Sequence, residues 1–355
     1  MSPGKPLDIL IFGTGAVGST IGWRLAQNPH ARLSVVCRSN YNAVKQNGIQ
    51  LSTKMWGNGT FLPYRVIRSP REASDMTFDY VVCANKVTPS DGLSFVGELA
   101  PAVTEKTTLV SAQNGVGVEA PLRKAFRNNT ILSAICYISC LQPAPGTVQQ
   151  VSSIRPHAFH IGTYDAREGK GTDESRLGKF VALDDRFKRI SDAQAERWTK
   201  QIFNGAWNPM AAISGLETHP LLTSPYLQTV RQLAHEMYEV ALKLGISLSD
   251  DLPAKTIEFA KNNPSLAPSM LQDARMKRPM EVESLCGNIC RQADQIGVPV
   301  PTIKLVYHTL LGMNSQMLAP TQPLAARTLQ SVRRRHSVPQ ELSVEREVEA
   351  VAVAC

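Results

Sequence analysis

The sequence predicts an α/β N-terminal domain with a doubly wound, mostly parallel sheet, followed by an all-α C-terminal domain. Two patterns support this. Apolar runs of strand length alternate with helical segments as far as Ser139, which is typical of a parallel sheet. From Ser191 onward only helical patterns occur. The 355 residues suffice for two domains. We therefore expect domains at 1–190 and 191–320, and a mobile tail at 321–355.

The N-terminal domain begins with an apolar strand, a glycine turn and a helix. The expected strands are 8–12, 32–37, 78–84, 107–111 and 131–139, and the first helix is 19–27. Residues 146–151 and 158–164 indicate two short strands of an antiparallel extension. Residues 168–174 are rich in glycine and charge, which predicts a surface loop.

The C-terminal domain opens with a helix that Ser191 or Asp192 can cap and that continues toward Asn208. Further helical stretches are expected at 221–244 and 279–296. Gly245 and Gly297 follow them, where helix C-caps belong.

Charge and cysteine content narrow the class of protein. The formal net charge of +8 suits an anionic ligand as well as nucleic acid, but the basic residues lack interleaved aromatics, so we expect no nucleic-acid partner. No signal peptide and no apolar run of membrane-spanning length is present, so a soluble, cytoplasmic protein is expected. The seven scattered cysteines lack CxxC knuckles, which favours reduced thiols and no metal.

A glycine-rich motif lies between the first strand and the first helix, in the context that dinucleotide binding requires. The first glycine allows a tight turn, the second lets backbone approach a pyrophosphate, and the third allows close packing of helix and strand. The helix N-terminus offers free N–H groups to phosphates. The candidate cofactor-binding residues are Gly13, Thr14, Gly15, Ala16, Val17 and Gly18.

The end of the second strand discriminates between the two nicotinamide dinucleotides. NAD enzymes usually carry an acidic residue there, which binds the ribose 2′-hydroxyl. This sequence instead has Cys37-Arg38-Ser39-Asn40. A carboxylate would repel a 2′-phosphate, whereas the Arg38 fork can bind it. We therefore expect NADPH.

Lys200, Asn204 and Asn208 recur every fourth residue and therefore share one face of a helix. Asparagine is unfavourable inside helices, and a buried amide without a partner costs roughly 1–3 kcal/mol. The stripe therefore predicts a polar site on a mostly apolar helix, although a solvated helix face explains the same spacing.

Several motifs in order resemble the ketopantoate reductase family along most of residues 7–315. They are the N-terminal GxGxxG, Ala84-Asn85-Lys86, Gln113-Asn114-Gly115, Lys200-x3-Asn204-x3-Asn208-Pro209, and Ser269-Met270-Leu271-Gln272-Asp273 followed by Glu281. The tail after about residue 320 has no counterpart in that family.

The resemblance implies a Rossmann domain joined to a helical domain, with the site in the cleft between them. It implies reduction of 2-dehydropantoate to pantoate, the step of pantothenate biosynthesis, with hydride delivered to the ketone carbon. Independently of the resemblance, Asp273 and its neighbours Arg275 and Glu283 are expected as surface or capping groups, because charged residues are usually exposed. The implied roles are Lys200 as general acid, Glu281 as the residue that tunes it, Asn114 beside nicotinamide and substrate, Lys86 near the cofactor, and Asn204, Asn208 and Ser269 as substrate ligands.

Two other functions fit the same residues. The substrate can be a different small 2-keto acid, used for example in secondary metabolism. Alternatively, the chain binds NADPH as a sensor without turnover, although the retained Lys200, Asn114, Ser269 and Glu281 argue against this. Association of two copies of the chain into a homodimer is a further hypothesis.

Overall fold

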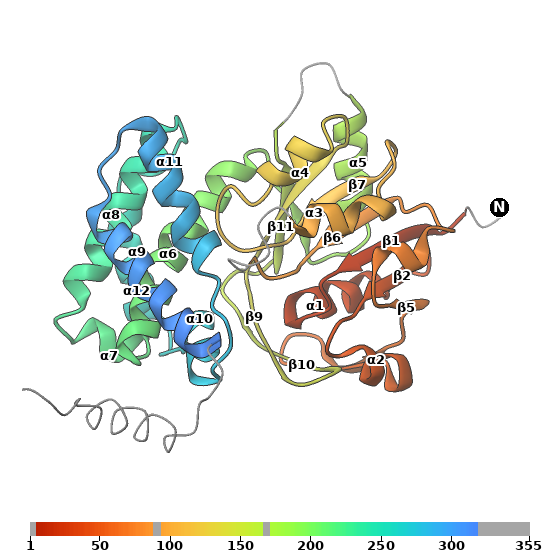
Figure 1. Ribbon diagram of the computed structural model, residues 1–355, viewed down its shortest axis with the longest axis horizontal. Coiled ribbons are helices and arrows are strands. Elements are labelled where there is room, and N and C mark those ends of the chain that lie inside the picture. Colours follow the sequence, from red (N-terminus) through yellow and green to blue (C-terminus); the bar gives the residue numbers. More distant parts are fainter. Residues whose placement is uncertain (1–4, 88–93, 166–170, 319–355) are drawn as a thin grey trace, which may run out of the picture. The chain divides into compact units, whose positions relative to one another are not determined.

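The computed structural model describes residues 5–87, 94–165 and 171–318. Its main sheet has eight strands in the order β12-β11-β8-β7-β6-β1-β2-β5 (Figure 1). The strands from β8 to β5 run parallel, β11 is antiparallel to β8, and β12 is parallel to β11. The strands are β1 Leu7–Phe12, β2 Ala31–Val36, β5 Arg65–Ile67, β6 Tyr80–Cys83, β7 Thr108–Ser111, β8 Ile131–Cys136, β11 Phe159–Thr163 and β12 Phe187–Arg189.

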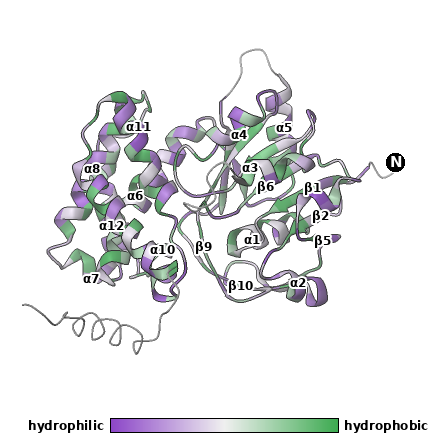
Figure 2. Cartoon of the chain, in the orientation of Figure 1, coloured by the Kyte–Doolittle hydropathy of each residue, from purple (hydrophilic) through white to green (hydrophobic). Residues whose placement is uncertain are grey.

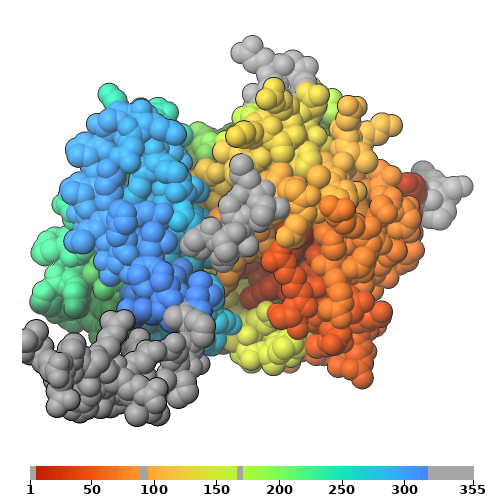
Figure 3. All heavy atoms as spheres, in the orientation of Figure 1, coloured from red at the N-terminus to blue at the C-terminus, as the bar shows by residue number. Residues whose placement is uncertain are grey.

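Both faces of this sheet are buried, because side chains of the central strands alternate between two apolar clusters. In β1, Ile9 and Ile11 belong to one cluster, and Leu10 and Phe12 belong to the other. In Figure 3 little of the dark red β1 is visible, as expected for a covered central strand. The helices of this half are α1 Ala16–Leu25, α2 Tyr41–Asn47, α3 Ser94–Leu99, α4 Ala120–Ala125 and α5 Gly171–Val181, with 3₁₀ turns at Pro70–Ala73 and Ala100–Ala102.

A second sheet of four strands, in the order β4-β3-β10-β9, was not predicted. It contains β3 Ile49–Thr53, β4 Gly57–Phe61, β9 Ile138–Ala144 and β10 Thr147–Ser153. The single strand expected at 131–139 is wrong. The chain leaves the main sheet after Cys136, and β9 pairs with β10 instead. Of the two strands expected as an antiparallel extension, only β11 joins the main sheet, whereas β10 lies in the second.

The prediction of a surface loop at 168–174 is wrong in part. Residues 166–170 lie outside the described part of the chain, but α5 already begins at Gly171. Asp173 and Glu174 occupy its first turn, where acidic groups favour the positive end of the helix dipole.

The all-α prediction holds for the described residues from 191 to 318, with corrected boundaries. Asp192 caps the first helix by accepting a hydrogen bond from the Ala195 N–H at 2.8 Å, and Gly215 ends it in the left-handed conformation. The stretch expected at 221–244 is two helices separated at Ser224-Pro225. The elements are α6 Ala193–Ser214, α7 Thr218–Leu222, α8 Leu227–Lys243, α9 Leu252–Asn262, α10 Ser269–Arg275, a π-helical turn Glu283–Gly287, α11 Asn288–Ile296 and α12 Pro301–Leu318.

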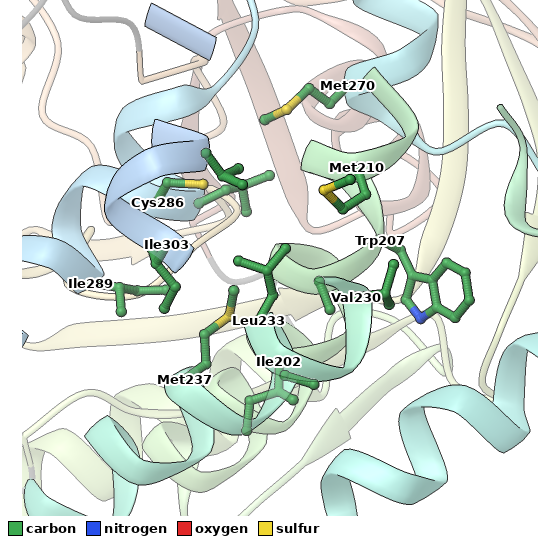
Figure 4. Close-up of a cluster of buried hydrophobic side chains, with 14 of the residues drawn as sticks. Ile202, Trp207, Met210, Val230, Leu233, Met237, Met270, Cys286, Ile289 and Ile303 are labelled. Atoms are coloured by element: carbon green, nitrogen blue, oxygen red, sulfur yellow. The ribbon is translucent and has the colours of Figure 1, made fainter. Parts of the chain in front are cut away.

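Helix α6 is the centre of the helical half and packs against α8 and α10. Figure 4 shows Ile202 and Met210 of α6 gathered with Leu233 and Met237 of α8 in one apolar cluster. Figure 2 shows both hydrophobic (green) and hydrophilic (purple) residues along α8 and α11, as expected for helices with one apolar face. This packing fixes the rotation of α6, and so decides where its polar stripe points.

No helix among residues 5–87, 94–165 and 171–318 is both long and apolar enough to cross a membrane. The tail expected at 321–355 lies outside these ranges.

Candidate active site

The glycine turn after β1 has the geometry that the motif predicts. Gly13 has a φ of 98°, and a Cβ there would lie 2.3 Å from the Asn85 backbone N. A Cβ on Gly18 would lie 2.2 Å from the Gly13 carbonyl oxygen, so only glycine lets α1 pack this closely. A Cβ on Gly15 would meet nothing within 4 Å, which leaves the backbone open to a ligand.

The turn and the start of α1 fit a dinucleotide pyrophosphate. Gly15 is the N-cap of α1 and provides no side-chain cap, so the first N–H groups of the helix are free to bind an anion. Thr14 donates a hydrogen bond to the Val36 carbonyl at 2.6 Å, and the Asn40 amide donates to the Thr14 carbonyl at 2.7 Å. These two contacts hold the turn against the end of β2.

Arg38 lies just beyond the end of β2, with 61% of its side chain exposed. Its guanidinium contacts the Glu98 carboxylate of α3 at 2.8 Å. Because this pair is exposed, its partner is easily exchanged, and a 2′-phosphate can compete for the guanidinium. No acidic residue occupies the 37–40 segment itself.

The predicted catalytic residues meet in one chain of contacts, although they are distant in sequence. The Lys200 amine on α6 donates to the Asn114 Oδ1 at 2.7 Å, and the Asn114 amide lies 3.4 Å from the Glu281 carboxylate. Asn114 lies in the turn after β7, at the carboxyl edge of the parallel sheet. A small cavity there is lined by Gln113, Asn114, Gly115, Ile135, Arg197, Lys200, Gln201 and Asn204.

Burial perturbs the two ionisable groups in opposite senses. Burial of the Lys200 amine lowers its pKa to about 8, an effect that the neighbouring Cys136 opposes and the cation of Arg197 reinforces. Burial also raises the pKa of the Glu281 carboxyl, against the opposing effects of Lys86 and Asn114. A lysine with a lowered pKa in an enclosed polar cavity is suited to proton transfer.

The two asparagines of the polar stripe on α6 have different surroundings. Asn204 lines the cavity beside Lys200. Asn208 is buried, and its Oδ1 accepts hydrogen bonds from the Ser269 hydroxyl and from the Met270 N–H, both at 3.0 Å. Asn208 therefore ties the first turn of α10 to α6 and brings Ser269 to the same helix face.

Lys86 and Asp273 form an ion pair of 2.5 Å between the segment after β6 and α10. Asp273 also contacts Arg278 at 3.0 Å. Lys86 was expected near a cofactor, and its amine is bound to the Asp273 carboxylate in this structure, so its cofactor role stays a prediction. Asp273 was expected as a surface or capping group, which is wrong, because only 4% of it is exposed. Its partner comes from 187 residues away, which sequence spacing does not reveal.

Arg197 was not among the residues predicted from the sequence. It is 3% exposed, and its guanidinium binds the turn that carries Asn114. It donates to the carbonyls of Gln113 at 2.8 Å and Gly115 at 3.0 Å, and it pairs with Glu119 at 2.7 Å. Its position in the sequence could have indicated this role, because a residue three positions before Lys200 is its neighbour on the helix surface.

Comparison with known proteins supplies the family. The model of the family "Ketopantoate reductase PanE/ApbA" matches residues 9–166, and that of "Ketopantoate reductase PanE/ApbA C terminal" matches residues 192–314. Together they span well over half of the chain.

Relatives of similar length agree with this result. A 2-dehydropantoate 2-reductase from Nostoc sp. is 26% identical, with 84% of this chain and 93% of the relative covered. The crystal structure of 2-dehydropantoate 2-reductase from Methylococcus capsulatus is 29% identical with a TM-score of 0.77, and 89% of this chain and 99% of that chain are covered.

A more distant structure shares the fold alone. It is a ternary structure of D-mandelate dehydrogenase with NADH and anilino(oxo)acetate, which is 18% identical with a TM-score of 0.74 and covers 88% of this chain and all of that one, 100%. The two matched family models, with the Rossmann-type sheet and the helical region described above, lead to one conclusion. The chain belongs to the ketopantoate reductase family and is an oxidoreductase that acts on a CH–OH group.

Proposed function

We propose that this enzyme uses NADPH to reduce the ketone of 2-dehydropantoate, giving pantoate, with Lys200 as the general acid. The observation that carries the proposal is the partly buried Lys200 amine, whose pKa is lowered to about 8 and which is bound to Asn114 beside a cavity at the carboxyl edge of the sheet. Ligands of doubly wound folds bind at this edge.

The chemistry requires one proton and one hydride. When bound, the reduced nicotinamide supplies the hydride to the ketone carbon. As hydride arrives the ketone oxygen becomes an alkoxide, which Lys200 stabilises by its charge and then protonates. Asn114 accepts a hydrogen bond from the amine and so orients it. The nearby Glu281 carboxylate favours the charged form of Lys200.

The remaining polar groups of the stripe suit the rest of a small keto acid. Asn204 lines the cavity and offers an amide to the substrate carboxylate or hydroxyl. Ser269 and Asn208 lie within hydrogen-bonding distance of each other and form the neighbouring polar group on α10 and α6. A few fixed donors of this kind determine the orientation of a small acid in its pocket.

Preference for NADPH over NADH rests on the exposed Arg38 at the end of β2. A bidentate guanidinium matches the geometry of a 2′-phosphate, and no carboxylate of residues 37–40 competes for it. We assign Lys86 to the same ligand, with its ammonium exchanging Asp273 for a ribose or phosphate group of the dinucleotide.

The experiment is the oxidation of NADPH followed with 2-dehydropantoate and a panel of branched and aromatic 2-keto acids. Because general acid catalysis contributes roughly 10²–10⁴-fold, Lys200→Ala should lower kcat by about that factor. Lys304→Ala is the matched control, since this lysine is partly exposed on α12 and paired with Asp294.

Wild-type kcat in Lys200→Ala would refute the role of the amine. Turnover of another keto acid with a kcat/KM far above that of 2-dehydropantoate would change the substrate and leave the mechanism intact. Binding of NADPH without turnover of any keto acid would instead favour the sensor function.

A further inference from the structure

We propose that Arg197 is a positioning residue that holds the Asn114 turn, and through it the Lys200 amine, in the reactive arrangement. The inference rests on the proposed reductase function. Arg197 does not touch the reacting atoms in this assignment. It acts through the turn 113–115, which it binds on both sides of Asn114.

The contacts of the guanidinium are concentrated on the backbone of this one segment. It donates to the carbonyls of Ser111 at 3.3 Å, Gln113 at 2.8 Å and Gly115 at 3.0 Å. Two further donors contact the Ser133 hydroxyl at 2.9 and 2.6 Å. Nη1 donates to both carbonyls that flank Asn114, while Nη2 and Nε bind Ser111 and Ser133 on the strands. Only a planar fork with several donor nitrogens can bind the turn and the strands together.

The turn is also held from the opposite side. Gly115 has a φ of 98°, and a Cβ there would lie 2.1 Å from the Ser284 carbonyl oxygen. The Asn288 amide of α11 donates to the Val116 carbonyl at 2.8 Å. With Arg197 on one side and the 284–288 segment on the other, the backbone that carries Asn114 has little freedom to shift.

The charge of Arg197 is balanced inside the protein. Glu119, which is fully buried, lies 2.7 Å from the guanidinium and also accepts from the Ser133 hydroxyl at 2.6 Å. Buried ion pairs contribute little net stability compared with apolar residues of the same volume. A gain in stability therefore does not explain why the Arg197–Glu119 ion pair is buried here. Placement of the turn explains it, because the turn needs the guanidinium and the guanidinium needs a counter-charge.

Arg197 and Lys200 are less than one helical turn apart on α6, so the contacts close into a ring. The ring runs from α6 through Arg197 to the turn, from Asn114 to the Lys200 amine, and back to α6. A displacement of about 1 Å at a reacting group can cost on the order of 10²-fold in rate. The ring restricts displacements of that kind.

Arg197 also contributes to the electrostatics of the amine. Its cation lowers the pKa of Lys200, although burial is the larger cause. The other groups that face this amine are Cys136 on β8, the ring of Tyr137, whose centroid lies 6.0 Å from Nζ, and the Glu281 carboxylate. Removing the cation should therefore raise the pKa of Lys200, with these neighbours left in place.

Two variants separate the geometry of Arg197 from its charge. Arg197→Lys keeps the charge, but a single ammonium cannot bind the turn and the strand groups Ser111 and Ser133 together, and the variant should lower kcat by about tenfold. Arg197→Met removes both, and should lower kcat by about 10²-fold and move the pKa of Lys200 upward. The KM for NADPH should stay within about twofold in both variants, because Arg197 contacts neither the glycine turn nor Arg38, the groups that bind the cofactor phosphates in this proposal.

The control is Arg24→Met, which breaks a comparable ion pair with Asp184 at 2.8 Å at the far end of α1. It should lower thermal stability and leave kcat unchanged. A purely structural role for Arg197 predicts the same behaviour for its variants, with full kcat per folded molecule.

A second readout does not depend on turnover. The rate at which acetic anhydride modifies Lys200, followed by peptide mass spectrometry across pH, reports the pKa of this amine. If the wild-type enzyme reduces no keto acid, the proposed function fails, while this titration still tests Arg197 by itself. Unchanged kcat and unchanged Lys200 titration in the variants would overturn the inference. If Arg197→Met does not fold, wild-type kcat in Arg197→Lys overturns it, and a reduced kcat at normal KM supports it.

Discussion

Raising the pH above 8 should switch off ketone reduction, because the proposed general acid loses its proton. Lys200 must be protonated to donate, and burial lowers its pKa from the ordinary 10.5 to about 8. At pH 9 about a tenth of Lys200 would still be protonated, whereas an ordinary lysine would be almost fully protonated. kcat should therefore fall about fiftyfold between pH 8 and 10, whereas an ordinary lysine would lose its proton only above pH 10.

The sign of the effect can be checked in the reverse reaction. Oxidation of pantoate needs a base, so its kcat should rise through the same pKa as the Lys200 amine becomes neutral. The other titrating neighbours do not produce this pattern. Burial raises the pKa of Cys136 above its ordinary 9.0, and raises that of Glu281 above its ordinary 4.5. Ionisation of Glu281 as the pH rises would favour the protonated form of Lys200, so this carboxyl cannot produce the fall in kcat.

The assay is kcat at saturating NADPH and keto acid from pH 6 to 10, with NADPH deuterated at the transferred position. An isotope effect on kcat ensures that the hydride step is observed rather than product release. Lys200→Arg, which does not titrate in this range, should lose the descending limb. A wild-type kcat that stays flat to pH 10 while the isotope effect is fully expressed would refute the assignment.

Two further predictions concern the cofactor region. Arg38→Ala should raise the KM for NADPH by about 10–100-fold and leave the KM for NADH nearly unchanged, because only NADPH carries a 2′-phosphate. Equal effects on the two KM values in steady-state kinetics would contradict this. Gly18→Ala should lower the free energy of unfolding in urea by about 1–3 kcal/mol, because the new Cβ would lie 2.2 Å from the Gly13 carbonyl oxygen. Gly15→Ala is its matched control, with an open Cβ position: it should keep wild-type stability and weaken NADPH binding. A comparable loss of stability there would show that position 15 is packed rather than open.

Features that depend on neighbours along the chain could be predicted from the sequence. The apolar strand before Gly13 and the helix that follows the glycine turn were predicted from local patterns, although α1 begins at Ala16 rather than at Ser19. Asp192, one of the two predicted caps, borders α6 as capping physics requires. The spacing of Lys200, Asn204 and Asn208 already put them on one helix face. These features were accessible because a helix or a glycine turn depends on residues only a few positions apart.

The course of β9 shows where local patterns fail. The run 131–139 is apolar and β-rich throughout, so nothing in it indicates that the chain changes sheets after Cys136. That change depends on pairing with β10 and on the approach of β3, which lies some 90 residues earlier in the chain.

The family, the alternating architecture and the helix face that bears Lys200 could all be assigned from the sequence, and the resemblance already put Asn114 and Glu281 at the same site. That Arg197, Cys136 and Tyr137 also face the amine became evident only from the tertiary structure. Asn114 is 86 residues away, and the Gln113 carbonyl bound by Arg197 is 84 residues away. Burial of Lys200, and hence its lowered pKa, arises only when these distant segments exclude water from the amine. The physical reason is that desolvation is a property of the packed surroundings of a group and has no counterpart in local sequence.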